Sequence, residues 1–191
     1  MPYKPHKDHK NPDLVFVNFN AMDFVFGSSI PLFEQNIRKT LERLTSRFPQ
    51  STIVVTPLVD VVSLMLSAES AVTLPPRLEF PGFTCAQSYK KIGFDKALGL
   101  NANTTPAEIE EKRAKFASMQ QTLDTEVDFL KEHRASVSYE NFSGKVIKIE
   151  AGEPPEGQWP AYLSADCLHP NVAGQMVISN RIWRALQAEY L

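Results

Sequence analysis

The chain has 191 residues, of which 43% are hydrophobic and 22% are charged, and its net charge is -2. This composition is typical of a globular domain with a sizeable core and argues against a largely disordered chain. The near-neutral charge provides no basic field for nucleic acid, so we expect no DNA or RNA partner. No apolar run in the sequence approaches the roughly 18 to 20 residues that are needed to span a bilayer.

Residues 1–12 are rich in Lys, His and Pro and are expected to form an exposed lead-in to a single domain over 13–191. They contain no apolar segment of the kind that a signal peptide requires. His6 and His9 with Asp8 could bind a metal ion, but a flexible tail offers no preorganised site. We therefore expect neither a metal nor a cofactor.

Short apolar segments alternate with amphipathic ones along the rest of the chain. The predicted strands are 14–19, 51–57 and 144–149, all rich in aliphatic residues. Apolar residues at helical spacing predict helices over 31–49, 61–66, 106–130 and the residues after Asn171. The alternation predicts a three-layer α/β/α fold with a parallel sheet. Three strands make a small sheet for this class, so the domain looks incomplete.

Two segments carry more specific expectations. Thr105, Pro106 and Glu108 have the pattern of a capping box, so a long helix should begin there, with its apolar stripe in the core. Residues 72–100 hold three prolines and three glycines, and we expect them to form a long ordered loop that shapes a binding site.

The strongest chemical signal is Asp166-Cys-Leu-His169-Pro-Asn171, just before the last predicted helix. In a Ser/His/Asp triad the imidazole takes a proton from the serine, and the carboxylate holds the imidazole in the right tautomer. An Asp three residues before a His can supply that hydrogen bond within one loop. The alternative is that Asp166 caps the helix and His169 is an exposed neighbour.

Two blocks of the sequence resemble the SGNH/GDSL hydrolases. The segment from Asp166 through the following Ala-Gly-Gln resembles the family's last motif block, in which this Asp and His complete the catalytic triad. The segment from Asp13 to Asp23 resembles the strand that ends in Gly-x-Asn-Asp, and the strand between Pro49 and Pro57 is similar to the phospholipase B-like branch. The resemblance implies the family's flavodoxin-like fold. It also implies a lipase or esterase that acts on a small-molecule or lipid ester, meets membrane surfaces through its substrate and needs no cofactor.

The chain also departs from the family pattern. The family's Gly-Asp-Ser strand, which carries the nucleophile, would lie before Asp13. The chain therefore resembles the C-terminal portion of such an enzyme, and we expect it to be truncated. Met22 stands where the family has an Asn that donates a hydrogen bond to the oxyanion, and a thioether cannot donate one. Asn20 could substitute in part, or could be a plain turn residue. We assign the oxyanion and substrate region to Asn20, Met22 and Asp23.

Three further residues have two interpretations each. Ser29 is the candidate nucleophile within the chain, because Val25-Phe-Gly-Ser-Ser-Ile30 superficially resembles the Gly-Asp-Ser block; it could instead be a loop or helix-cap residue. Cys85 and Cys167 could form one disulfide or remain two buried thiols.

Three functional hypotheses follow. The first is an ester hydrolase completed by a preceding segment. The second is an inactive relic of the fold that binds a lipid or protein, with a dimer partner or a foreign strand covering an exposed sheet edge. The third is an unrelated α/β domain with an accidental Asp-x-x-His.

The patterns at Asn103 and Asn141 fit glycosylation acceptors and, with the family, point to secretion or an endomembrane lumen.

Overall fold

The computed structural model describes residues 12–19, 21–70, 85–100, 103–133, 139–150, 162–163, 167 and 169–190. Within these ranges the elements follow one another in the order β1 (Leu14–Asn18), α1 (Met22–Val25), α2 (Ile30–Arg47), β2 (Thr52–Thr56), α3 (Val61–Ser70), α4 (Cys85–Ile92), α5 (Phe94–Leu98), α6 (Pro106–Glu132), β3 (Val146–Lys148) and α8 (Val172–Tyr190). The expected lead-in over 1–12 lies outside the described residues except for Pro12.

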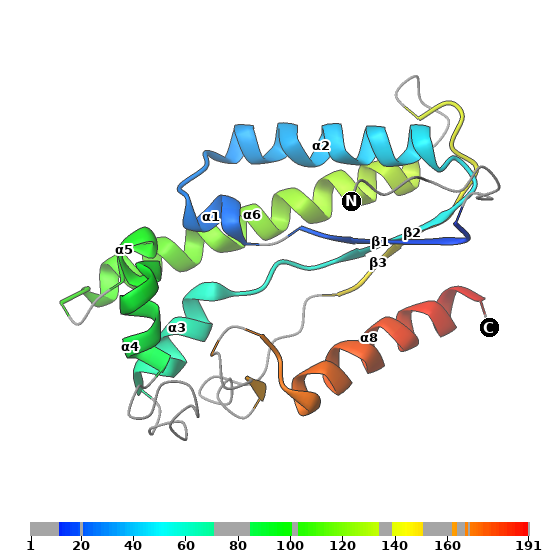
Figure 1. Ribbon diagram of the computed structural model, residues 1–191. Helices are drawn as coiled ribbons and strands as arrows, with labels where there is room; N and C mark the ends of the chain where they lie inside the picture. The colour runs from blue at the N-terminus through cyan, green and yellow to red at the C-terminus, as the bar shows by residue number, and fades with distance from the viewer. Residues whose placement is uncertain are drawn as a thin grey trace, which may run out of the picture.

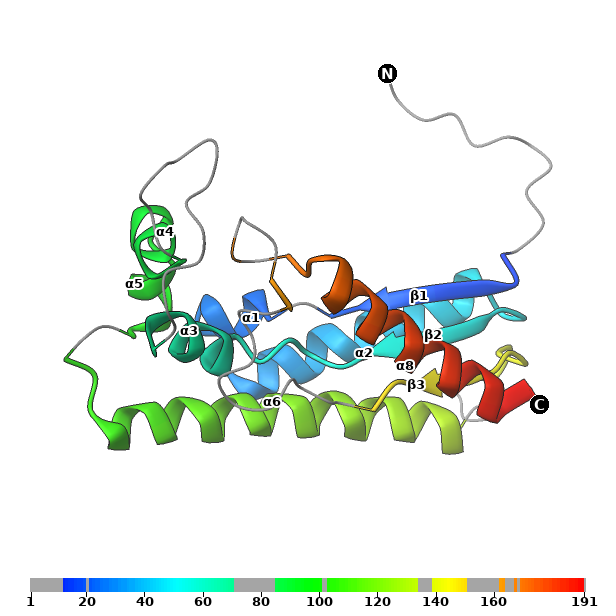
Figure 2. The same ribbon diagram turned by 90° about the horizontal axis from the view of Figure 1, so that it is seen from below.

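The three strands form one parallel sheet in the order β1-β2-β3, with helices on both faces (Figure 1). Helices α2 and α6 pack against each other on one face, and α8 runs across the other face, as the view from below also shows (Figure 2). The strands are parallel because helical crossovers, rather than tight hairpins, join them. This is the three-layer α/β/α arrangement that the sequence predicts.

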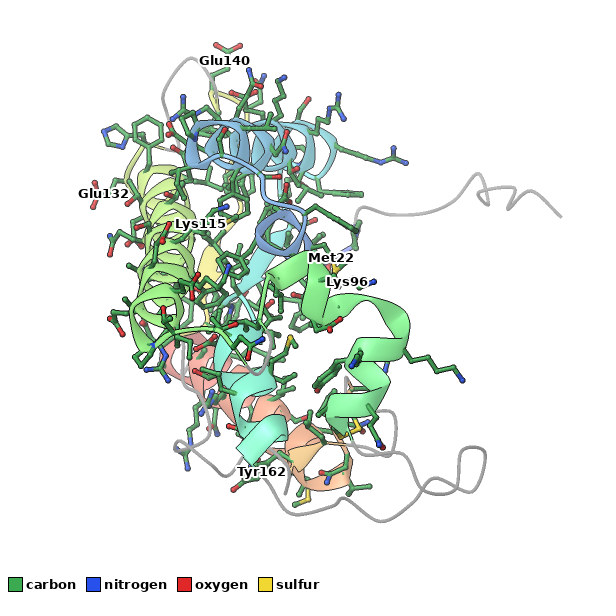
Figure 3. The ribbon with its side chains drawn as sticks, turned by 90° about the vertical axis from the view of Figure 1, so that its left-hand side faces the viewer. Met22, Lys96, Lys115, Glu132, Glu140 and Tyr162 are labelled. Atoms are coloured by element: carbon green, nitrogen blue, oxygen red, sulfur yellow. A yellow bond between two sulfur atoms is a disulfide. The ribbon has the colours of Figure 1, made fainter. Side chains whose placement is uncertain are left out.

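Four short helices gather at the edge of the sheet where the strands end. Figure 3 shows Met22 on α1, beside α5, and the two helices are in contact. The prediction of a long loop over 72–100 was wrong for its second half, where α4 and α5 lie. Gly93 and Gly99 flank α5 with φ values of 75° and 62°, a conformation that glycine adopts without strain. These glycines mark the ends of a five-residue helix, not a continuous loop.

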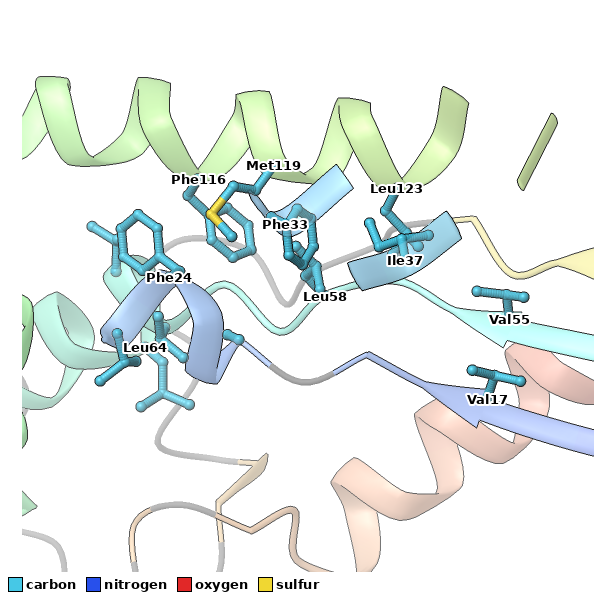
Figure 4. Close-up of a cluster of buried hydrophobic side chains, with 14 of the residues drawn as sticks. Val17, Phe24, Phe33, Ile37, Val55, Leu58, Leu64, Phe116, Met119 and Leu123 are labelled. Atoms are coloured by element: carbon cyan, nitrogen blue, oxygen red, sulfur yellow. The ribbon is translucent and has the colours of Figure 1, made fainter. Parts of the chain in front are cut away.

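The main core lies between the sheet and the α2–α6 layer (Figure 4). Val17 and Val55 point into it from the sheet, and they meet large side chains that recur at helical spacing on the two helices: Phe33 and Ile37 on α2, and Phe116, Met119 and Leu123 on α6. Burying one such side chain stabilises the fold by about 1.5–3 kcal/mol relative to leaving it exposed. The apolar stripe of α6 is therefore a core surface, as predicted.

The first turn of α6 has the capping box that the sequence predicts. Thr105 Oγ1 accepts a hydrogen bond from the Glu108 backbone N–H at 3.3 Å, and Glu108 Oε2 accepts one from the Thr105 N–H at 2.7 Å. The bond from the Thr105 backbone is the largest cause that lowers the pKa of Glu108. Each of the two hydrogen bonds satisfies a backbone N–H group that has no partner inside the helix.

A buried carboxylate joins α6 to α2. Glu126 is 5% exposed, and its two oxygens accept hydrogen bonds from Arg38 Nε at 3.0 Å and Arg38 Nη2 at 2.6 Å. These bonds are the first cause that raises the pKa of Arg38 above its ordinary value. A carboxylate at this depth is tolerated only with such a partner.

On the opposite face, α8 covers only β2 and β3. The helix packs on an apolar cluster made of Val54 of β2, Ile147 of β3 and Ile149 directly after β3. Its contacting side chains are Ile182, Ala185 and Leu186. On the neighbouring part of this face, Leu14 and Phe16 of β1 are 36% and 52% exposed. The helix therefore leaves β1 open on this side.

One flank of α8 carries exposed apolar side chains. Met176, Trp183 and Tyr190 are seven residues apart, so they share this flank, and all three are exposed. The Tyr190 hydroxyl forms a hydrogen bond with Thr52 Oγ1, and Thr52 is the register partner of Leu14 on β1. We call the apolar region made by Leu14, Phe16, Met176, Trp183 and Tyr190 the β1–α8 surface.

Replacing Arg38 with Ala is expected to lower the free energy of unfolding by about 1.5–3 kcal/mol, because the Glu126 carboxylate would stay buried without its donors. Urea denaturation measures the change. Arg43→Ala, at an exposed position of the same helix, is the matched control and should change stability by less than about 0.5 kcal/mol. Equal losses in the two variants would contradict a specific role for the pair.

Candidate active site

The segment from Tyr162 to Asn171 contains the Asp-x-x-His sequence, and its two ends meet directly before α8. The Asn171 backbone N–H donates to the Tyr162 carbonyl oxygen at 2.8 Å, and Asn171 Nδ2 donates to the Leu163 carbonyl oxygen at 3.1 Å. Leu163 and Pro170 also form an isolated antiparallel bridge. These contacts tie the two ends of the segment together, and we call it the His169 segment.

Asn171 also begins the last helix. Its Oδ1 accepts a hydrogen bond from the Gly174 N–H at 3.0 Å, as the side chain of an N-cap residue does. Asn171 is therefore the N-cap of α8, the role that the sequence analysis gave as the alternative for Asp166. Gly174 lies so close to the segment that a Cβ there would be 2.5 Å from the Tyr162 carbonyl oxygen. Glycine is the residue that permits this approach.

The sequence analysis did not name Asn171 as a site residue, although a signal for it was present. An Asn directly before an amphipathic helix is a recognised helix start. What the sequence could not indicate is the second hydrogen bond, from Asn171 Nδ2 to Leu163, because it depends on the path of the preceding loop.

His169 lies two residues before the start of α8 and is exposed. Asp166 lies outside the described residues. The predicted hydrogen bond between the Asp166 carboxylate and the His169 imidazole therefore stays a prediction.

Cys85 and Cys167 form a disulfide, which decides between the two states that the sequence left open. The bond connects α4 to the middle of the Asp-x-x-His sequence. Tyr89, one turn further along α4, donates a hydrogen bond from its hydroxyl to the Cys167 carbonyl oxygen. Both cysteines and Tyr89 are buried.

An apolar pocket of about 210 Å³ opens beside the His169 segment. It lies at the carboxyl ends of β1 and β2, where Asn18 and Thr56 contribute to its wall, and Pro170 belongs to its lining. The first turns of α8 close it, with Val177 among the residues that face it. In open α/β sheets, ligands bind at this edge of the strands.

The predicted oxyanion and substrate residues have separate positions. Asn20 lies outside the described residues, and Met22 begins α1, where it is 39% exposed. Asp23 Oδ1 accepts a hydrogen bond from Ser28 Oγ at 3.0 Å, and its carbonyl oxygen accepts one from the Ser28 N–H at 2.9 Å. Asp23 thereby closes the turn between α1 and α2, and a role of these residues toward an oxyanion stays a prediction.

Ser29 is the N-cap of α2. Its Oγ accepts a hydrogen bond from the Leu32 N–H at 3.4 Å. This is the helix-cap role that the sequence offers as the alternative to a nucleophile. Helix α2 belongs to the layer opposite α8 (Figure 1), and the role of Ser29 as a nucleophile stays a prediction.

In the described part of the chain, no group of His, Cys, Asp and Glu side chains is arranged to hold a metal ion. His6, Asp8 and His9 lie outside it. None of the helices within the described ranges is both long enough and apolar enough to cross a membrane.

The family model of GDSL-like lipases and acylhydrolases matches residues 2–182. The match covers most of the chain, and the protein belongs to this family of ester hydrolases. No curated protein and no solved structure matches the chain significantly. Membership agrees with the three-layer fold and with the resemblance of the two motif blocks to SGNH/GDSL hydrolases.

Asn171 provides a test of how the His169 segment is held. Asn171→Ala removes the helix cap and the bond to Leu163, and it should lower the free energy of unfolding by about 1–2 kcal/mol. Asn171→Asp is the matched variant, because a carboxylate still caps the helix but cannot donate to the Leu163 carbonyl. Both variants should speed amide hydrogen exchange in the His169 segment, and only the Ala variant should lower the unfolding midpoint. Unchanged exchange in the Asp variant would mean that the Leu163 bond does not hold the segment.

Proposed function

We propose that the chain is the C-terminal, triad-bearing part of a GDSL-type serine ester hydrolase. A serine attacks the ester carbonyl, His169 takes the serine proton and returns it to the leaving alcohol, and Asp166 orients the imidazole. Water then hydrolyses the acyl-enzyme by the same route. The observation that carries the proposal is the position of the His169 segment, tied to the start of α8 beside a pocket at the strand ends.

The pocket is suited to the acyl chain of the ester. Its wall is largely aliphatic, with Leu58, Leu64, Leu163 and Ile178 among the lining residues. Each acyl methylene that leaves water for such a wall contributes about 0.8 kcal/mol to binding. We therefore propose a lipid ester as substrate, in line with the resemblance to the phospholipase B-like branch.

The β1–α8 surface supports the proposal that a further segment completes the sheet. Among the described strands β1 lies at one edge of the sheet, and Leu14 and Phe16 are exposed on the face that α8 leaves open. Neighbouring strands lie about 4.8 Å apart, and packed helices lie about 8–10 Å apart. A strand paired with β1 and a helix beside α8 would thus fit together and cover Phe16 and Trp183. We propose that this segment carries the nucleophile.

Fluorophosphonate labelling tests the proposal, because the probe forms a covalent adduct with an activated serine. The chain joined to the sequence encoded upstream should give one adduct by intact mass, and His169→Ala should abolish it. The chain alone should give none. An upstream region without an in-frame Gly-Asp-Ser strand would contradict the proposal of a C-terminal part.

A His169-dependent adduct on the chain alone would place the nucleophile inside it. Peptide mapping would then identify the serine, with Ser29→Ala as the first variant to examine. No adduct on a folded, completed chain would favour an inactive member of the family that binds a lipid or protein. Met22, which cannot donate a hydrogen bond where the family has an Asn, favours this second candidate.

If the pocket binds the acyl chain, filling it should affect long acyl chains more than short ones. In the chain joined to the upstream sequence, Val177→Trp should fill the space and lower kcat/KM for an octanoyl ester at least about tenfold more than for an acetyl ester, a difference of about 1.4 kcal/mol. Ala173→Trp is the matched control, because Ala173 is exposed on the same helix and does not line the pocket. Parallel losses for both esters would show that the acyl chain binds elsewhere.

A secreted or endomembrane-lumenal location also belongs to this proposal. Disulfides persist in oxidising compartments, and the chain has one between Cys85 and Cys167. Asn103 and Asn141, the two glycosylation acceptors, are both exposed.

A further inference from the structure

The described residues of the His169 segment are attached to the rest of the protein from two directions. The ends of the segment are tied together through Asn171, directly before α8. Cys167, one residue after Asp166 and two before His169, is joined to Cys85 on α4 by the disulfide. The second attachment acts two residues before His169, so it bears directly on how the His169 side chain is presented.

Cys167 has a backbone conformation that it would not adopt by preference. Its φ is 64°, and it is the one non-glycine residue with a positive φ in the described part of the chain. This conformation costs roughly 1–2 kcal/mol for a residue with a Cβ, and it persists only where the surroundings impose it. At Cys167 the surroundings are the disulfide to Cys85 and the hydrogen bond from the Tyr89 hydroxyl to its carbonyl oxygen.

Helix α4, which makes both contacts, is itself packed into the core. Cys85 and Tyr89 are 2% and 1% exposed and belong to the main core. The Tyr89 ring packs against Phe94 of α5, with 5.8 Å between ring centroids. Helix α4 also contacts α3, which follows β2. The contacts on Cys167 therefore connect this residue to the sheet through packed helices.

We infer that Cys85 and Tyr89 are positioning residues for His169. Through them, α4 imposes the left-handed conformation at Cys167 and so restrains the backbone that presents the His169 imidazole, two residues further on. The inference rests on the proposed function for the catalytic role of His169. The restraint on Cys167 is a property of the fold and can be measured without catalysis.

Two variants separate the two contacts. Tyr89→Phe removes only the hydroxyl and keeps the buried ring. The Cys85→Ser/Cys167→Ser double variant removes the disulfide. A dithiol reductant acts on the same bond in the unmodified chain, because the disulfide takes up two electrons and two protons while the dithiol becomes a cyclic disulfide. Tyr139→Phe is the matched control, since Tyr139 is also buried but packs against Phe129 of α6.

The measurement is nuclear magnetic resonance of the ¹⁵N-labelled full chain, with His169→Gln used to assign the His169 imidazole. The ¹⁵N shifts of the ring should report one tautomer in the oxidised chain and in Tyr139→Phe. Tyr89→Phe, the double-serine variant and the reduced chain should give averaged shifts. They should also show at least about tenfold faster exchange of the backbone amides between Leu163 and His169.

The outcomes distinguish the inference from the proposed function. Averaged tautomers in the oxidised chain, with amide exchange that still quickens in the variants, would uphold the restraint but contradict an Asp166–His169 pair. A single tautomer and unchanged amide exchange in Tyr89→Phe and the reduced chain would overturn the positioning role of α4. Tyr89→Phe keeps the test valid even where the double-serine variant fails to fold.

Discussion

The burial of β2 on both faces is the constraint on which the rest of the structure depends. Ile53, Val54 and Val55 are almost inaccessible to solvent, so the middle strand needs apolar cover above and below. A parallel sheet meets this need by connecting its strands through helices. Because the strands are parallel, their carboxyl ends all lie at one edge of the sheet. The same constraint that makes the core therefore creates an edge where loops from distant parts of the chain come together. The pocket and the His169 segment both lie there.

At that edge, the site is held by local and distant contacts of different kinds. Asn171 closes the His169 segment and begins α8 with one side chain, so the helix and the segment are built as a unit. The disulfide and Tyr89 connect the same segment to α4, which is 82 residues away in sequence at the disulfide. A histidine on an exposed loop would otherwise have considerable conformational freedom. If His169 is the general base of the proposed function, it needs restraints of this kind, since proton transfer depends on geometry before acidity.

The β1–α8 surface connects the fold with the functional proposal. The α2–α6 layer covers its face of the sheet well, whereas α8 packs on β2 and β3 and leaves Leu14 and Phe16 of β1 exposed. An unpaired strand edge next to exposed apolar side chains is a surface that proteins usually cover. Under the proposed function, the covering segment would also carry the nucleophile, so one segment would complete both the sheet and the triad.

The sequence by itself determined the strands, the long helices, the capping box at Thr105 and the family, because these depend on local periodicity and on short motifs. It also predicted a catalytic role for His169 from the Asp-x-x-His sequence, and that role stays a prediction. It failed over 85–98, where two short helices lie between glycines that read as loop signals. Only the tertiary structure decided that Cys85 pairs with Cys167, that Tyr89 reaches the Cys167 carbonyl and that a pocket lies under the start of α8. Each of these contacts joins residues far apart in the chain, and their meeting depends on how the helices pack, which no local pattern encodes.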